Sequence, residues 1–225
     1  MKIFLHFLYH RFWSKIGILI LFSVLSGCYL PRNFESRLEV DQLGAWRYIY
    51  KGTLTSTNLL RKFSEGEWTP EQLKNTKEGQ EHVAYYLRDM RRIEGVQRVK
   101  YVEDADFELD FLYIHNLHYG KRFKFLNKAN PIFSMIYEGD TVNIVAGKVN
   151  RGYAEELTDR GFVMKGSLEV VTDAHLSYHN AHQVDHLANN VKVLSWEMKL
   201  LTEPAAYVSL KLDPAKKPNL QNNIE

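Results

Sequence analysis

Cysteine is almost absent from this sequence: Cys28 is the only one among 225 residues. A single cysteine cannot form a disulfide within the chain, so cross-links do not hold the fold together. A chain of this length can bury a core without them. A strong charge is missing too, because the formal net charge is only +2. Proteins that bind nucleic acids usually present a basic face, so near-neutrality argues against a nucleic-acid partner.

Long apolar runs and the common catalytic motifs are also missing. The most apolar run, IGILILFSVL at 16–25, is shorter than the ~20 residues that a membrane-spanning helix requires. The chain has no G-x-S-x-G, no H-E-x-x-H and no glycine-rich phosphate loop. A triad written from Ser177, His179 and Asp185 lacks hydrogen-bond geometry on a strand. We therefore expect that the protein is not an enzyme, and an anchored hydrolase is the weakest functional hypothesis.

The N-terminal segment has the order of an export signal. Three basic residues come first, Lys2, Arg11 and Lys15, and the apolar run and two small residues follow. This order predicts that residues 1–27 are a signal peptide. Without that segment the chain carries 26 basic and 27 acidic side chains, a formal charge of −1.

Residues 25–28 form the motif LSGC, which resembles the lipobox of bacterial lipoproteins. The resemblance implies a lipid on the sulfur of Cys28, cleavage before Cys28, and three acyl chains that anchor the mature N-terminus in a membrane. Tyr29 stands where an aspartate retains enterobacterial lipoproteins in the inner membrane, so the resemblance implies the periplasmic face of the outer membrane. The residues by themselves also allow a plain signal peptide or an uncleaved signal anchor.

We expect the mature chain to have three parts. Residues 28–44, with Pro31 and Asn33 soon after the cysteine, predict a lipidated N-terminus and tether. Residues 45–213 predict a single α+β periplasmic domain. Residues 214–225 are polar and have no apolar period, which predicts a disordered tail.

The first half of the domain predicts a strand, a helix and a second strand. Residues 46–57 are rich in aromatic and β-branched side chains, which favour a strand. Thr69 and Gln72 have the spacing of a capping box, and Gly95 stands where that helix would end. Apolar residues then alternate with acidic ones, which predicts a half-buried strand whose solvent face carries Asp106, Glu108 and Asp110.

The second half looks similar, because in each half a helix is followed by a glycine and then by a strand that contains an Asp-Ala pair. The apolar spacing over 142–157 fits one helix, and a strand at 141–146 followed by a helix from Asn150 fits as well. Apolar and polar residues alternate over 168–178, and again over 191–201, which predicts two further strands.

The predicted fold class is therefore α+β. Two main helices pack on a mixed, mainly antiparallel sheet, and the matching order of the two units allows the interpretation that they are related α-β-β halves. Residues 80–115 also resemble small bacterial envelope lipoproteins of unknown function, where a helix leads into a strand of the DADFELDF kind.

Histidine is the residue type that gathers most clearly. The stretch HLSYHNAHQVDH spaces four of them closely, and imidazole is a common ligand of zinc and copper. Because the alternation predicts a strand up to Tyr178, only the following loop could wrap around one ion, through His179, His182 and His186. The alternative interpretation is that these side chains face water or make hydrogen bonds at strand ends.

The stretch RDMRRIEGVQRVK clusters five basic residues: Arg88, Arg91, Arg92, Arg98 and Lys100. They predict either the exposed side of a helix or an interaction patch for anionic headgroups or an acidic partner.

Our leading hypothesis is a lipid-anchored periplasmic accessory or assembly protein that binds another envelope protein. The alternative is a periplasmic lipoprotein that binds zinc or copper through the histidine-rich loop.

Overall fold

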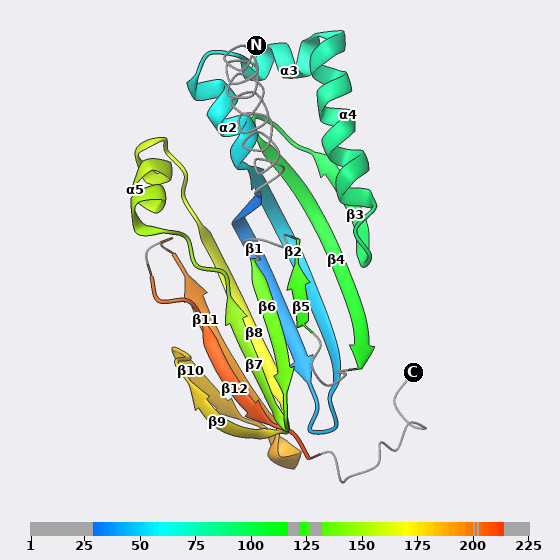
Figure 1. Ribbon diagram of the computed structural model, residues 1–225, viewed down its shortest axis with the longest axis vertical. Coiled ribbons are helices and arrows are strands. Elements are labelled where there is room, and N and C mark those ends of the chain that lie inside the picture. The colour runs from blue at the N-terminus through cyan, green and yellow to red at the C-terminus, as the bar shows by residue number, and fades with distance from the viewer. Residues whose placement is uncertain (1–28, 117–121, 127–131, 200, 202, 214–225) are drawn as a thin grey trace, which may run out of the picture.

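The computed structural model describes residues 29–116, 122–126, 132–199, 201 and 203–213. The predicted signal segment with its lipobox, and the predicted C-terminal tail, lie outside these residues. The described chain forms two β-sheets with helices gathered at one end (Figure 1). The predicted α+β class, with helices on mixed and mainly antiparallel sheet, is confirmed.

The larger sheet has seven strands in the order β10 (Gln183–His186), β11 (Lys192–Met198), β8 (Lys165–Thr172), β1 (Tyr29–Val40), β2 (Ala45–Ser56), β4 (Asp106–Asn116) and β3 (Val96–Tyr101). Only β1 and β8 are parallel among its neighbouring strands. The smaller sheet is antiparallel, in the order β5 (Arg122–Phe125), β6 (Phe133–Glu138), β7 (Thr141–Ala146), β12 (Tyr207–Lys211) and β9 (His175–His179).

The helices are α2 (Thr57–Ser64), α3 (Pro70–Asn75), α4 (Lys77–Arg91) and α5 (Arg151–Asp159), with a short 3₁₀ turn at Ala188–Asn190. The predicted capping box is present, because Thr69 Oγ1 accepts from the Gln72 N–H and Gln72 Oε1 accepts from the Thr69 N–H. The single helix predicted up to Gly95 is divided at Thr76, which has extended backbone and caps α4.

One face of the larger sheet holds the core. Tyr48 of β2 stacks on Phe133 of β6, with ring centroids 4.8 Å apart, and joins the two sheets. Tyr86 of α4 packs on Phe107 of β4 at 5.8 Å, so helix and smaller sheet cover the same face. The other face carries ion pairs, such as that between Arg47 and Glu39.

The predicted tether at residues 28–44 is wrong, because residues 29–40 form β1. This strand lies between β2 and β8, with Leu38 and Val40 buried. Pro31 is accommodated where the pairing with β2 shifts register, a position that tolerates a residue without an N–H donor. The prediction failed because alternate side chains of this twelve-residue segment are buried in the core, and this burial outweighs the local preference of Pro31 against a strand.

The structure decides two further predictions. Residues 141–157 form a strand followed by a helix and not one helix, since β7 ends at Ala146 and Asn150 caps α5. The alternation over 168–178 is not one strand but two. Its chain turns at Asp173, so β8 joins the larger sheet and β9 joins the smaller one. Asp173 Oδ1 accepts from the Gln42 N–H at 2.7 Å and fixes this turn.

Candidate functional site

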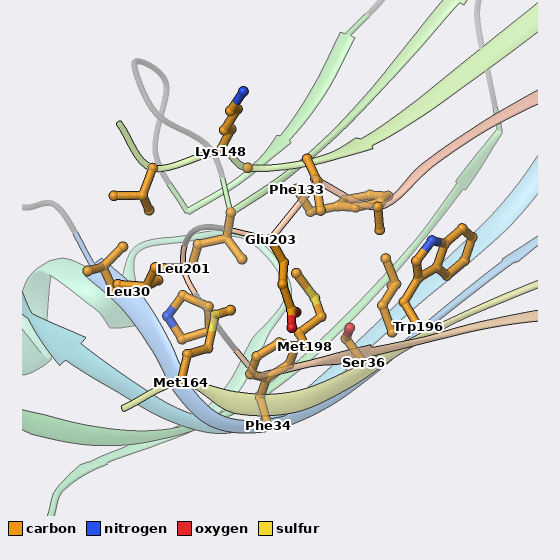
Figure 2. Close-up of a pocket in the computed structure, with 18 of the residues that line it drawn as sticks. Leu30, Phe34, Ser36, Phe133, Lys148, Met164, Trp196, Met198, Leu201 and Glu203 are labelled. Atoms are coloured by element: carbon orange, nitrogen blue, oxygen red, sulfur yellow. The ribbon is translucent and has the colours of Figure 1, made fainter. Parts of the chain in front are cut away.

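An apolar cavity lies between the two sheets, at the end of the molecule where β1 begins. It is lined by the start of β1, the segment after β7, the residue before β8, the end of β11 and the segment before β12. Its volume is about 90 Å³. The side chains that surround it include Leu30, Phe34, Met164, Trp196, Met198 and Leu201 (Figure 2).

The shape of the cavity wall depends on two glycines that flank Phe34. The register shift in β1 turns Phe34 against Gly52 of β2, and the ring stacks on Tyr50 with centroids 5.7 Å apart. On the other side the ring lies against Gly166 of β8, where an added Cβ would stand 2.4 Å from ring carbons. Gly52 therefore lets the β1 backbone at Phe34 come close to β2, and Gly166 leaves room for the Phe34 ring in the wall.

Polar groups in the wall are satisfied within the protein. Ser36 Oγ donates to the Ser167 carbonyl at 3.1 Å, and Trp196 Nε1 donates to Asn180 Oδ1 at 2.9 Å. Burial raises the pKa of Tyr48 far above its ordinary value, so its phenol is neutral at any physiological pH. Apart from the charged side chains described below, the wall thus suits an apolar group.

Charged side chains lie at the rim. Lys148, His182 and Glu197 are exposed, and Glu203 is half-buried and extends toward Met198 in Figure 2. Lys199 donates to Glu197 at 2.6 Å and holds the pKa of that carboxyl below its ordinary value. The carboxylates of Glu197 and Glu203 thus balance the two lysines, so the rim has no excess of positive charge that would attract a negatively charged headgroup.

Close to the start of β1, Asp106 is buried and does not face solvent as the alternation predicted. Its carboxylate accepts from Thr55 Oγ1 at 2.6 Å and from Arg32 Nη1 at 2.8 Å. The prediction of a solvent-facing Asp106 failed because of tertiary structure. Arg32 of β1 lies beside this first residue of β4, and its positive charge compensates the buried carboxylate. Glu108 and Asp110 lie on the solvent side of β4 as predicted.

The predicted basic patch is divided by the fold. Arg98 pairs with Glu108 at 2.9 Å and Asp110 at 3.0 Å, and Lys100 also pairs with Glu108. Three arginines at the end of α4 are exposed and have no ion pair with any residue that the structure describes: Arg88, Arg91 and Arg92. Lys100 also lowers the pKa of Glu108, since its ammonium stabilises the carboxylate.

The three predicted metal ligands lie on different parts of the fold. His179 ends β9 in the smaller sheet, and His186 ends β10 in the larger one. Nδ1 of His179 accepts from the Ala181 N–H, whereas Nδ1 of His182 accepts from the Glu197 N–H. Among the described residues, no three histidine, cysteine or acidic side chains are placed to hold one metal ion. Zinc or copper binding stays a prediction that metal titration would test.

The cavity itself escaped prediction from the sequence. Trp196 and Met198 were recognisable as the inward face of a strand, but the same pattern is typical of any core strand. Leu30, Met164 and Leu201 come from three distant segments of the chain and converge only when the sheets are packed. The one available signal was two methionines near loops, since methionine often lines adaptable apolar sites.

Comparison with known proteins identifies no family. No family model and no curated protein matches the chain. A solved structure, the NMR structure of the folded domain of Mycobacterium tuberculosis LppM, is similar with a TM-score of 0.35 and 11% identity. The match covers 82% of this chain and 94% of that one.

Within the described residues, no helix has the length and apolar character needed to cross a membrane.

Proposed function

We propose that the chain is a lipid-anchored accessory protein of the bacterial cell envelope, at the periplasmic face of the outer membrane, that acts by binding another envelope protein. One observation carries the proposal: β1 begins at Tyr29, the residue directly after Cys28. Neighbouring Cα atoms are ~3.8 Å apart, so a lipid on Cys28 would hold the folded domain directly against the bilayer. The start of β1 lies at the same end as α2 and α5 (Figure 1), which would face the membrane.

The partner surface that we propose is the exposed side of α4. Tyr85, Arg88 and Arg92 follow one another at helical spacings of three and four, and Tyr85 is 57% exposed. Tyrosine and arginine are enriched at protein interfaces, and arginines that have no ion pair in the described part of the chain suit an acidic surface. We therefore propose an acidic region of an envelope protein as the partner.

The anchor is tested with the variant Cys28→Ser. We expect the variant to leave the membrane fraction or to keep its signal segment, because serine cannot carry the thioether lipid. Mass spectrometry of the native protein should find acyl chains on Cys28. A variant that remains membrane-bound and normally processed, with no lipid on the native chain, would refute the anchor.

The partner surface is tested by photo-crosslinking in cells. A photoreactive residue at Tyr85 should give a specific adduct, whereas the same residue at Tyr153, which is 39% exposed on α5, should not. The double variant Arg88→Glu and Arg92→Glu should remove the Tyr85 adduct, since it reverses the charge that attracts an acidic surface. An adduct that survives charge reversal would contradict this surface.

A further inference from the structure

We propose that the cavity between the sheets holds one acyl chain of the anchor attached to Cys28. The inference rests on the proposed function, because it requires a lipid on that cysteine. The inference adds a binding site to the proposed function, because part of the anchor would lie inside the protein rather than in the bilayer.

The first argument is position. Tyr29, Leu30 and Pro31, the three residues that follow Cys28, all line the cavity. The Cα atoms of Cys28 and Leu30 can be at most about 7 Å apart, because an extended chain spans ~3.3–3.6 Å per residue. A covalently attached chain is therefore always beside the cavity, at a high effective concentration that a free lipid does not have.

The second argument is chemistry. Leu30, Phe34, Met164 and Leu201 make the wall apolar, and its hydroxyl and indole groups are satisfied within the protein. An unbranched hydrocarbon needs no hydrogen bond, and it would replace an empty or wet apolar space with van der Waals contacts. Lys148 and Glu197 are exposed at the rim, where the ester or amide end of an acyl chain would remain in water, and the half-buried Glu203 lies beside Met198.

The third argument is size. A volume of about 90 Å³ corresponds to about six to nine water molecules, given roughly 10–15 Å³ for each. This is room for a segment of one acyl chain and not for a whole lipid. The lipobox resemblance implies three chains on Cys28, so one can enter the protein while the others remain in the bilayer.

Trp196 is a natural reporter because it lines the cavity and is buried. We compare two forms of the mature chain, the lipidated protein in detergent and the unlipidated Cys28→Ser form, both of which contain all the described residues. Each is titrated with the methyl ester of a brominated fatty acid, which has no charge and whose bromine atoms quench indole fluorescence at close range. Trp196→Phe identifies the share of Trp196 in the signal, and Trp46→Phe is the matched control for a buried tryptophan that does not line the cavity.

We expect the unlipidated form to lose the Trp196 share of its emission, and the lipidated form to keep it because its own chain occupies the cavity. Leu201→Asp, in a half-buried part of the wall, should prevent quenching in the unlipidated form without unfolding it. Equal quenching of both forms would overturn the assignment to the anchor, and no quenching of either would overturn the acyl site. Lack of a lipid on Cys28 by mass spectrometry would instead refute the proposed function, while the unlipidated form would still report on the cavity.

Discussion

Gly166 shows how a single residue supports the cavity. A methyl group on Gly166 would stand 2.4 Å from the ring of Phe34, which is buried against Tyr50 and cannot withdraw without opening the wall. We expect Gly166→Ala to lower the free energy of unfolding by about 1–3 kcal/mol, the usual cost of overpacking a core. Urea denaturation of the unlipidated mature chain measures this change.

The matched control for Gly166 is Gly152, in the first turn of α5. Around a Cβ at Gly152 the nearest atom is Asn150 Oδ1 at 3.5 Å, an ordinary contact. Gly152→Ala should therefore raise the free energy of unfolding by about 0.5–1 kcal/mol, because alanine favours the helix. Equal effects of the two substitutions would show that the Phe34 ring does not limit the space at Gly166.

At the scale of elements, α4 is connected to α2 through a histidine. His82 of α4 stacks on Trp68, with centroids 5.6 Å apart, and its Nε2 lies 3.4 Å from Lys62 Nζ of α2. Burial first, and then the Lys62 ammonium, hold the pKa of His82 below its ordinary value. The folded state therefore binds this proton less readily than the unfolded state. This contribution to stability is complete above pH ~6.5 and is lost as the pH falls through the folded pKa.

We expect Lys62→Met to raise the pKa of His82 toward its ordinary value, because the substitution removes a neighbouring positive charge and keeps the apolar stem. An NMR titration of the His82 ring measures the shift. Lys74→Met, on the exposed side of α3, is the control and should leave the pKa of His82 unchanged. No difference between the two variants would mean that Lys62 does not interact with the imidazole.

Elements also show where prediction from sequence succeeds. The capping box at Thr69 involves neighbours in the chain, so a local pattern was enough to place it, whereas local patterns left two interpretations of residues 141–157 open until the structure placed the cap at Asn150. The turn at Asp173 depends on the Gln42 N–H, which is far away in the sequence, and periodicity continues unchanged across it. Prediction therefore failed where a distant segment decides which sheet a strand joins.

At the scale of the whole molecule, β1 connects two halves of the larger sheet, because it pairs with β2 on one side and with β8 on the other. We expect removal of residues 29–40 to abolish cooperative unfolding, as measured by circular dichroism in urea. Glu35→Gln, an exposed change on the same strand, should alter stability by less than about 0.5 kcal/mol. A shortened chain with an unchanged urea midpoint would restore the tether interpretation.

The sequence alone determined the α+β class, the strands β2, β4 and β11, the capped start of α3, and the expectation of an anchor at Cys28, because these depend on periodicity, caps and motifs among neighbouring residues. Only the tertiary structure decided that β1 is a central strand, that Arg98 has ion pairs whereas the arginines at the end of α4 have none among the described residues, and that an apolar cavity lies beside the start of β1. The physical reason is the same in each case. Sheet pairing, ion pairs and cavity walls join residues that are far apart in the chain, and no local pattern records their partners.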